Sequence, residues 1–205
     1  MNQALTVYRD DGPIAEALGR LGRRAPVPGA VFAVLAALLV VVPALLAGED
    51  AGDGAVGAAV VGATLLGGLA TGRAERGSFR WLVPPAIRLT EYAGLLWLGA
   101  VAGGSGVPAA FALIAALAFR HYDLVYRLRH RGVTPPRWVD LTGLGWEGRL
   151  WAGVLLLELG ALPAGFFILA GIFAAVFVTE SVAGWTGTVR SQETAVYEEE
   201  EDEGQ

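Results

Sequence analysis

Residues Gly29 to Ala47 read GAVFAVLAALLVVVPALLA and contain no charged side chain. At 1.5 Å of rise per residue, a helix of this length covers roughly 28 Å, close to the ~30 Å hydrocarbon core of a bilayer. The segment is therefore predicted to be a transmembrane helix.

Apolar runs of similar length follow it. Further spans are predicted at about 54–71, 82–103 and 108–128. The run from Trp151 to Trp185 is too long for one span, at about 50 Å, and Gly160–Gly165 offers a turn within it. That run is predicted to be a hairpin whose first span is short. The predicted fold is an all-α polytopic membrane helix bundle with about six transmembrane helices, in the cell membrane.

Composition agrees with this fold class. Hydrophobic residues make up 54% of the 205 residues and charged residues 17%, whereas a soluble domain carries roughly a quarter charged residues. A soluble globular protein is therefore excluded. The absence of cysteine excludes a disulfide scaffold, a thiol nucleophile and a Cys-ligated metal.

The chain divides into three predicted parts. Residues 1–28 form an N-terminal cytoplasmic segment, in which Ile14, Leu18 and Leu21 give one apolar helical stripe that suits a membrane surface. Residues 29–186 form the six-span membrane domain. Residues 187–205 form an acidic disordered tail, and without its seven acidic side chains the net charge of -5 becomes +2.

Arginine, the only basic residue type besides histidine, sets the orientation. Within this scheme arginines precede the first span, follow the sixth, and lie between spans 2 and 3 and between spans 4 and 5. The other three loops contain no arginine, and the first of them carries Glu49, Asp50 and Asp53. The positive-inside rule then predicts that both termini are cytoplasmic.

Several ionisable side chains lie inside or at the ends of the predicted spans, mostly in their cytoplasmic halves. A charged side chain in a bilayer costs roughly 2.5–3.5 kcal/mol on insertion scales, so these groups are expected to converge on a cytoplasm-facing polar pocket. Because arginine binds phosphate bidentately, the pocket is predicted to hold a phosphorylated lipid or headgroup. The candidate ligand-binding residues are Arg88, Arg120, Tyr122, Arg127, Glu147, Arg149 and Glu180.

Catalysis is a second hypothesis for the same region. His121, Asp123 and Glu91 are the candidate acid–base residues of a stand-alone membrane enzyme acting on a phosphorylated lipid or isoprenoid. No metal site or other cofactor is predicted, because no HExxH or DxD signature supports a divalent metal. A small transporter using Glu91, Glu158 and Glu180 is the third hypothesis.

A purely structural interpretation stays open beside these hypotheses. Arg88 with Glu91 and Asp123 with Arg127 have the i,i+3 and i,i+4 spacings of intrahelical ion pairs. Tyr122 is also typical of the aromatic belt at a membrane interface.

Specific catalytic motifs are absent. Asp53-Gly54 begins like the active-site pattern of CDP-alcohol phosphatidyltransferases, but the required arginine and the later aspartates are missing. The chain has no P-loop, no GxSxG elbow and no dinucleotide fingerprint. Nucleic-acid binding has no support beyond the arginine content.

Four segments together resemble an actinobacterial integral-membrane domain of unknown function. They are TVYRDDGP (residues 6–13), WLVPP (81–85), RHYDLVYR (120–127) and GWEGR (145–149). The resemblance covers about residues 4–186. That domain is often fused behind nucleotidyltransferase and CDP-alcohol phosphatidyltransferase domains.

The resemblance implies an accessory or substrate-handling role in CDP-alcohol-dependent phospholipid synthesis, and it assigns no catalytic residue. The expected partners are a membrane lipid and a CDP-alcohol phosphatidyltransferase that acts in trans. A homo-oligomer is left open.

Overall fold

The computed structural model describes residues 9–72, 79–132 and 136–203, with the backbone alone at 131, 137 and 187–203. The protein is 86% helical, and its described residues contain no strand, which confirms the all-α class. In chain order the helices are α2 (Pro13–Gly22), α3 (Gly29–Ala47), α4 (Asp53–Thr71), α5 (Val83–Ala102), α6 (Gly106–Arg131), α7 (Arg137–Thr142), α8 (Gly145–Glu158) and α9 (Leu162–Glu203). The 3₁₀ turns η1 (Gly48–Asp50) and η2 (Arg80–Leu82) precede α4 and α5.

Four helical segments are long and apolar enough to cross a membrane. They are Gly29–Asp50, Asp53–Thr71, Gly106–His130 and Leu162–Thr186. Large apolar side chains on these segments point away from the protein, among them Leu45, Leu46, Phe111 and Ile168. Such a surface matches lipid better than water and is typical of a membrane protein.

The other two predicted spans correspond to helices of a different kind. α5 has 20 residues, but it carries Arg88 and Glu91 in its first half. α8 has 14 residues, about 21 Å, and is shorter than a ~30 Å bilayer core. The described part of the chain therefore has four membrane-length apolar helices, fewer than the predicted six spans.

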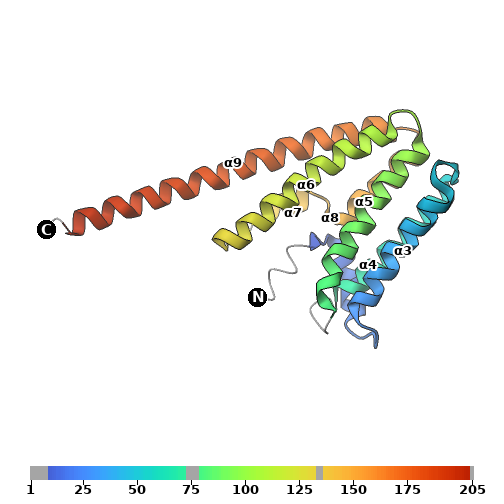
Figure 1. Ribbon diagram of the computed structural model, residues 1–205, viewed down its shortest axis with the longest axis horizontal. Coiled ribbons are helices and arrows are strands. Elements are labelled where there is room, and N and C mark those ends of the chain that lie inside the picture. Colours follow the sequence, from blue (N-terminus) through green and yellow to red (C-terminus); the bar gives the residue numbers. More distant parts are fainter. Residues whose placement is uncertain (1–8, 73–78, 133–135, 204–205) are drawn as a thin grey trace.

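The helices form two groups that meet at one end. α3, α4 and α5 lie together, and α6 packs along α9 (Figure 1). The chain passes from α5 to α6 through Gly103 and Gly104, whose φ angles of 67° and 52° favour glycine. From that turn α5 and α6 diverge, so that the first half of α5 and the second half of α6 form the sides of a wedge (Figure 1).

α2 packs against α4, and its predicted position at a membrane surface stays a prediction. Ala15, Gly19 and Gly22 form its buried face, while Ile14 and Leu21 of the predicted apolar stripe are exposed. Without a side chain on the two glycines, the backbones of α2 and α4 approach closely. Small residues one position away from the apolar stripe thus decide which face is buried.

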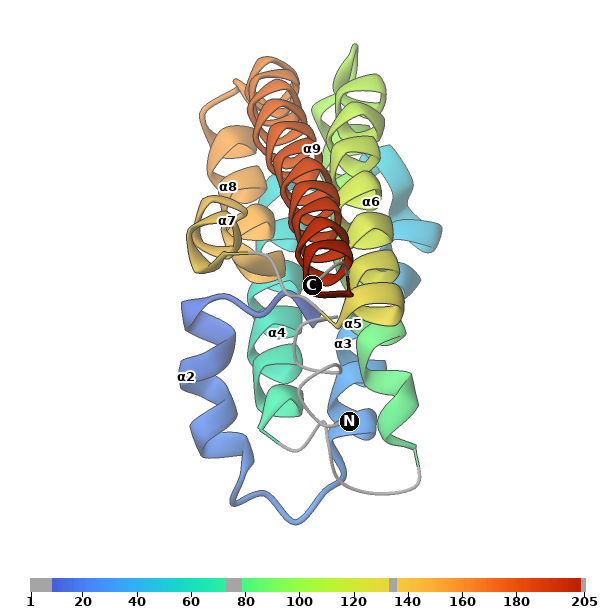
Figure 2. The same cartoon turned by 90° about the vertical axis from the view of Figure 1, so that its left-hand side faces the viewer.

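α2 and α8 share the length of α4 between them. α8 covers the upper part and α2 the lower part, with their N-terminal ends facing each other (Figure 2). Their 10 and 14 residues together span about 36 Å. α2 and α8, which are two separate segments of the chain, therefore together cover the length of α4.

α9 extends beyond the predicted last span. It continues to Glu203 and passes the end of α6 (Figure 1), whereas the sequence predicts disorder from residue 187. Residues 188–203 contain no Gly or Pro and are rich in glutamate, a good helix former. The acidic segment is therefore helical in the structure.

Candidate functional site

The charged side chains gather in the wedge between α5 and α6, and Arg149 of α8 lies at their centre. Its side chain is completely buried. Nε donates to Glu91 Oε1 at 2.5 Å, Nη2 donates to Asp10 Oδ2 at 2.8 Å, and Nη1 donates to the Gly143 carbonyl at 2.5 Å. One guanidinium thus ties together α5, α8 and the segment that precedes α2.

Arg120 of α6 makes the second set of contacts. Its Nη2 lies 3.2 Å from Asp10 Oδ1 and 2.5 Å from Asp140 Oδ1 of α7. The guanidinium also lies over the ring of Phe177 on α9, at 4.7 Å from the centroid. Asp10 therefore bridges Arg120 and Arg149, which come from different helices.

The remaining members of the cluster lie on the facing sides of α5 and α6. Arg88 Nη1 binds Glu91 Oε2 at 2.7 Å, which confirms the predicted i,i+3 pair. The Tyr92 hydroxyl lies 2.7 Å from Nδ1 of His121, whose Nε2 is 3.8 Å from Asp10 Oδ2. We call Asp10, Arg88, Glu91, Arg120, His121, Asp140 and Arg149 the wedge cluster.

The formal charges of the wedge cluster cancel. Its three arginines face three carboxylates, and each of these carboxylates contacts an arginine. The sequence predicts a pocket lined by arginines. In the structure carboxylates balance these arginines, so the wedge cluster has no excess positive charge. The sequence reasoning could not supply Asp10 and Asp140, because both lie outside the predicted spans.

The segment before α2 enters the wedge through backbone contacts as well. The Trp146 N–H donates to the Asp10 carbonyl at 3.1 Å. Glu147 accepts from the N–H groups of Gly12 and Ala15, at 3.1 and 3.0 Å, and so caps the N-terminus of α2. Glu147 thus caps α2, and its predicted role as a ligand contact stays a prediction.

The two aspartates of this segment have different environments. Burial alone would raise the pKa of Asp10, but the Arg149 guanidinium, a contact with His121 and the Arg120 guanidinium hold it well below its usual value. Burial raises the pKa of Asp11 despite its 2.8 Å pair with Arg9. Of these two aspartates, Asp10 is therefore the one whose ionised form the neighbouring arginines favour.

Three predicted residues form a separate network at the seam of α6 and α9. Arg127 binds both carboxylate oxygens of Glu180, at 2.8 and 3.0 Å, and its Nε lies 2.8 Å from Asp123 Oδ2. Asp123 also accepts from Ser181 and Trp185, at 2.9 and 3.2 Å. This confirms the predicted i,i+4 pair of Asp123 and Arg127, and it separates Arg127 from the arginines of the wedge cluster.

Two further predicted residues lie apart from both networks. Tyr122 is 69% exposed and stacks on Tyr126, with ring centroids 6.1 Å apart. Glu158 is exposed at the last residue of α8, at the opposite end from the wedge cluster.

A crevice opens between α5 and α6 beside the wedge cluster. Its volume is about 220 Å³, and its lining residues are Pro84, Pro85, Arg88, His121, Leu124 and Val125. Most of its wall is apolar, and Arg88 and His121 are its polar lining residues. A cavity of this character suits a molecule with an apolar part and an anionic part.

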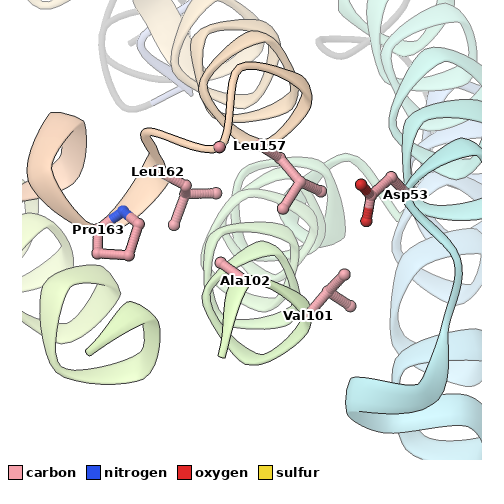
Figure 3. A pocket seen from close by; sticks show the side chains of 7 residues that line it. Asp53, Val101, Ala102, Leu157, Leu162 and Pro163 are labelled. Atoms are coloured by element: carbon pink, nitrogen blue, oxygen red, sulfur yellow. The ribbon is translucent and has the colours of Figure 1, made fainter. Parts of the chain in front are cut away.

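A second cavity of about 210 Å³ lies at the other end of the bundle (Figure 3). Its lining residues are Asp53, Val101, Ala102, Leu157, Gly160, Leu162 and Pro163. It contains none of the predicted site residues. In the described parts of the chain, no group of three or more His, Asp and Glu side chains is placed to hold a metal ion.

Residues 1–203 match a family of unknown function, DUF5941, so the chain belongs to that family. This agrees with the predicted resemblance to a domain of unknown function. Comparison with curated proteins and with solved structures gave no match.

Proposed function

We propose, from the geometry of the wedge and its crevice, that the chain is an accessory membrane protein that holds a phosphorylated lipid. The lipid headgroup would contact Arg88 and His121, and an acyl or isoprenoid chain would lie along Leu124 and Val125. The observation that carries this proposal is the crevice between α5 and α6, whose apolar wall includes the two polar residues Arg88 and His121.

The crevice provides the two kinds of contact that a lipid needs. Arg88 is part of its lining, and the side chain is 16% exposed. Val125 is 43% exposed, and the neighbouring surface of α6 includes the exposed Phe119 and Tyr122. A guanidinium that is accessible beside an apolar surface binds phosphate strongly, because little water competes for it.

The proposed arrangement in the cell membrane has six helices and both termini in the cytoplasm. The polar helix α5 packs against α3, α4, α6 and α8, and is thereby kept from lipid. The short α8 is completed by α2, as described above. The wedge cluster then lies toward the cytoplasm, together with the basic residues Arg20, Arg23 and Arg24.

Cysteine labelling tests this topology, and the chain offers a cysteine-free background. Asp50→Cys and Glu16→Cys both introduce an exposed thiol, at opposite ends of the bundle. In intact cells, a membrane-impermeant maleimide is expected to label Asp50→Cys and to spare Glu16→Cys until the membrane is opened. Labelling of Glu16→Cys in intact cells would reverse the orientation.

Lipid retention tests the binding site. The protein is purified in mild detergent, and bound lipids are identified by mass spectrometry. Wild type is expected to retain one class of phosphorylated lipid, and Arg88→Gln is expected to retain about tenfold less, as for loss of a charge-assisted contact. Glu91 keeps its 2.5 Å contact with Arg149 in this variant, so the fold is expected to persist.

The matched control is Arg129→Gln, which removes an exposed arginine of α6 outside the crevice. It is expected to retain lipid as wild type does. Equal loss in both variants would mean that arginines attract anionic lipid without a specific site, and the proposal would then be abandoned.

The partner proposed for this lipid-binding role is a CDP-alcohol phosphatidyltransferase acting in trans. Its support is the resemblance to a domain often fused to such enzymes. Recovery of a transferase of this class with the mildly purified protein would bear it out, and recovery of the chain alone would count against it.

A further inference from the structure

Asp10 has an unusual backbone conformation for a residue with a side chain. Its φ angle is 55°, in the left-handed region, where Asp is tolerated better than most residues other than glycine. Its carboxylate is buried, and its two oxygens bind guanidinium groups of α6 and α8 that come from far along the chain. The ion pairs of the Asp10 carboxylate with Arg120 and Arg149 thus hold the segment before α2 in this strained backbone conformation.

The donors around Asp10 outnumber the acceptor atoms that it offers. Its Oδ1 and Oδ2 serve the Nη2 atoms of Arg120 and Arg149. Nε of Arg120 and Nε2 of His121 are buried and have no hydrogen-bond partner among the described residues. The side chain of Arg120 is only 5% exposed, so its Nε–H has no easy access to water.

The position of His121 adds a donor at the same place. When the Tyr92 hydroxyl donates to Nδ1 at 2.7 Å, the proton of the neutral ring is on Nε2. That atom lies 3.8 Å from Asp10 Oδ2, too far for a hydrogen bond. A phosphate monoester has three terminal oxygens in place of two, and so it could accept from more of these donors than a carboxylate does.

We propose that Arg120, Arg149 and His121 form a binding site for a phosphate monoester, and that Asp10 occupies this site as an internal substitute. Displacement of Asp10 leaves the wedge cluster with three arginines and two carboxylates, so the site attracts an anion. The phosphate comes from a lipid headgroup or from a soluble phosphate. His121 also lines the crevice, so this site lies directly behind the lipid site of the proposed function, on which its lipid form rests.

The test replaces Asp10 and measures the response of the unfolding temperature to phosphate. In purified Asp10→Asn, inorganic phosphate at constant ionic strength is expected to raise the unfolding temperature by at least about 3 °C. Wild type, in which the carboxylate competes, is expected to respond less. Adding Arg120→Gln to Asp10→Asn is expected to abolish the response.

Asp11→Asn is the matched control, because Asp11 pairs with Arg9 and with Trp146 and has no contact with Arg120 or Arg149. It is expected to respond as wild type does. Asp10→Gly is the second variant, since glycine adopts a φ of 55° without strain and the variant is expected to fold. A folded Asp10→Gly protein that phosphate does not stabilise would overturn the proposal.

The same variants in nanodiscs with and without phosphatidic acid distinguish the two sources. Stabilisation by phosphatidic acid but not by inorganic phosphate identifies a lipid headgroup, and stabilisation by both identifies a site open to either. Absence of both responses overturns the inference. Failure of the Arg88→Gln test would instead remove the crevice as a lipid site and leave the response to inorganic phosphate intact.

Discussion

Replacing Arg149 by Met is expected to lower the free energy of unfolding by about 3–5 kcal/mol, as is typical when one partner of a buried ion pair is removed. Met retains an unbranched apolar side chain in place of the aliphatic part of Arg, so the main loss is that of the guanidinium and its contacts. Glu91 and Asp10 would each lose a guanidinium contact of 2.5 and 2.8 Å. Their burial leaves no water to replace these contacts.

Unfolding in mixed micelles, followed by tryptophan fluorescence, measures this change. Arg129→Met is the control, because Arg129 is exposed on α6, and it is expected to change stability by less than about 1 kcal/mol. Loss of Arg149 leaves the wedge cluster with two arginines and three carboxylates, so adding Glu91→Gln to Arg149→Met restores the charge balance and should restore part of the loss. If Arg149→Met is as stable as Arg129→Met, the wedge cluster does not hold the helices together.

Trp146→Ala is expected to cost about 3–5 kcal/mol, the range for truncating a buried aromatic side chain. Trp146 is fully buried, and its ring lies against Gly67 of α4, where an added Cβ would be 2.6 Å from it. Its Nε1 donates to Asp11 at 3.3 Å. The side chain thus fills the junction where the N-terminal ends of α2 and α8 meet.

Trp151→Ala provides the comparison on the same helix. Trp151 is 40% exposed, so its truncation leaves little cavity and is expected to cost about 1 kcal/mol or less. The same unfolding assay applies to both variants. Equal losses for the two tryptophans would contradict the packing of the α2–α8 junction described above.

The positions of the membrane-length helices could be predicted from the sequence, because a bilayer imposes a length on any apolar run. The bounds of α3 match the quoted run from Gly29 to Ala47. The pairs Arg88–Glu91 and Asp123–Arg127 could also be predicted, since spacings of three and four residues place side chains on one helical face. Both kinds of prediction use only residues that are close together in the sequence.

The long-range contacts of the site could not be predicted in this way. Asp10 and Arg149 are separated by 139 positions, and no periodicity relates a residue before α2 to one in α8. The two consecutive aspartates, Asp10 and Asp11, directly before a helix start were the available signal for a site residue in this segment. The carboxylate partners Asp10 and Asp140 could not be predicted, because both come from segments outside the predicted spans.

The buried face of α2 shows a second limit. Large apolar residues at helical spacing usually mark the buried face, but Gly19 and Gly22 allow a closer backbone approach than Leu21 would. Side-chain size at the contact therefore outweighed hydrophobicity. Lipid is as apolar as leucine, so a leucine side chain in a membrane bundle gains little by being buried in protein. Close packing of small residues then decides which helix face lies against its neighbour.

Native mass spectrometry of the wild-type protein, released from mild detergent, tests the central claim most directly. The account predicts a species in which one chain carries one phosphorylated lipid, held at the crevice beside Arg88 and His121. A spectrum with only lipid-free protein, or with a broad range of lipids and stoichiometries, would contradict it.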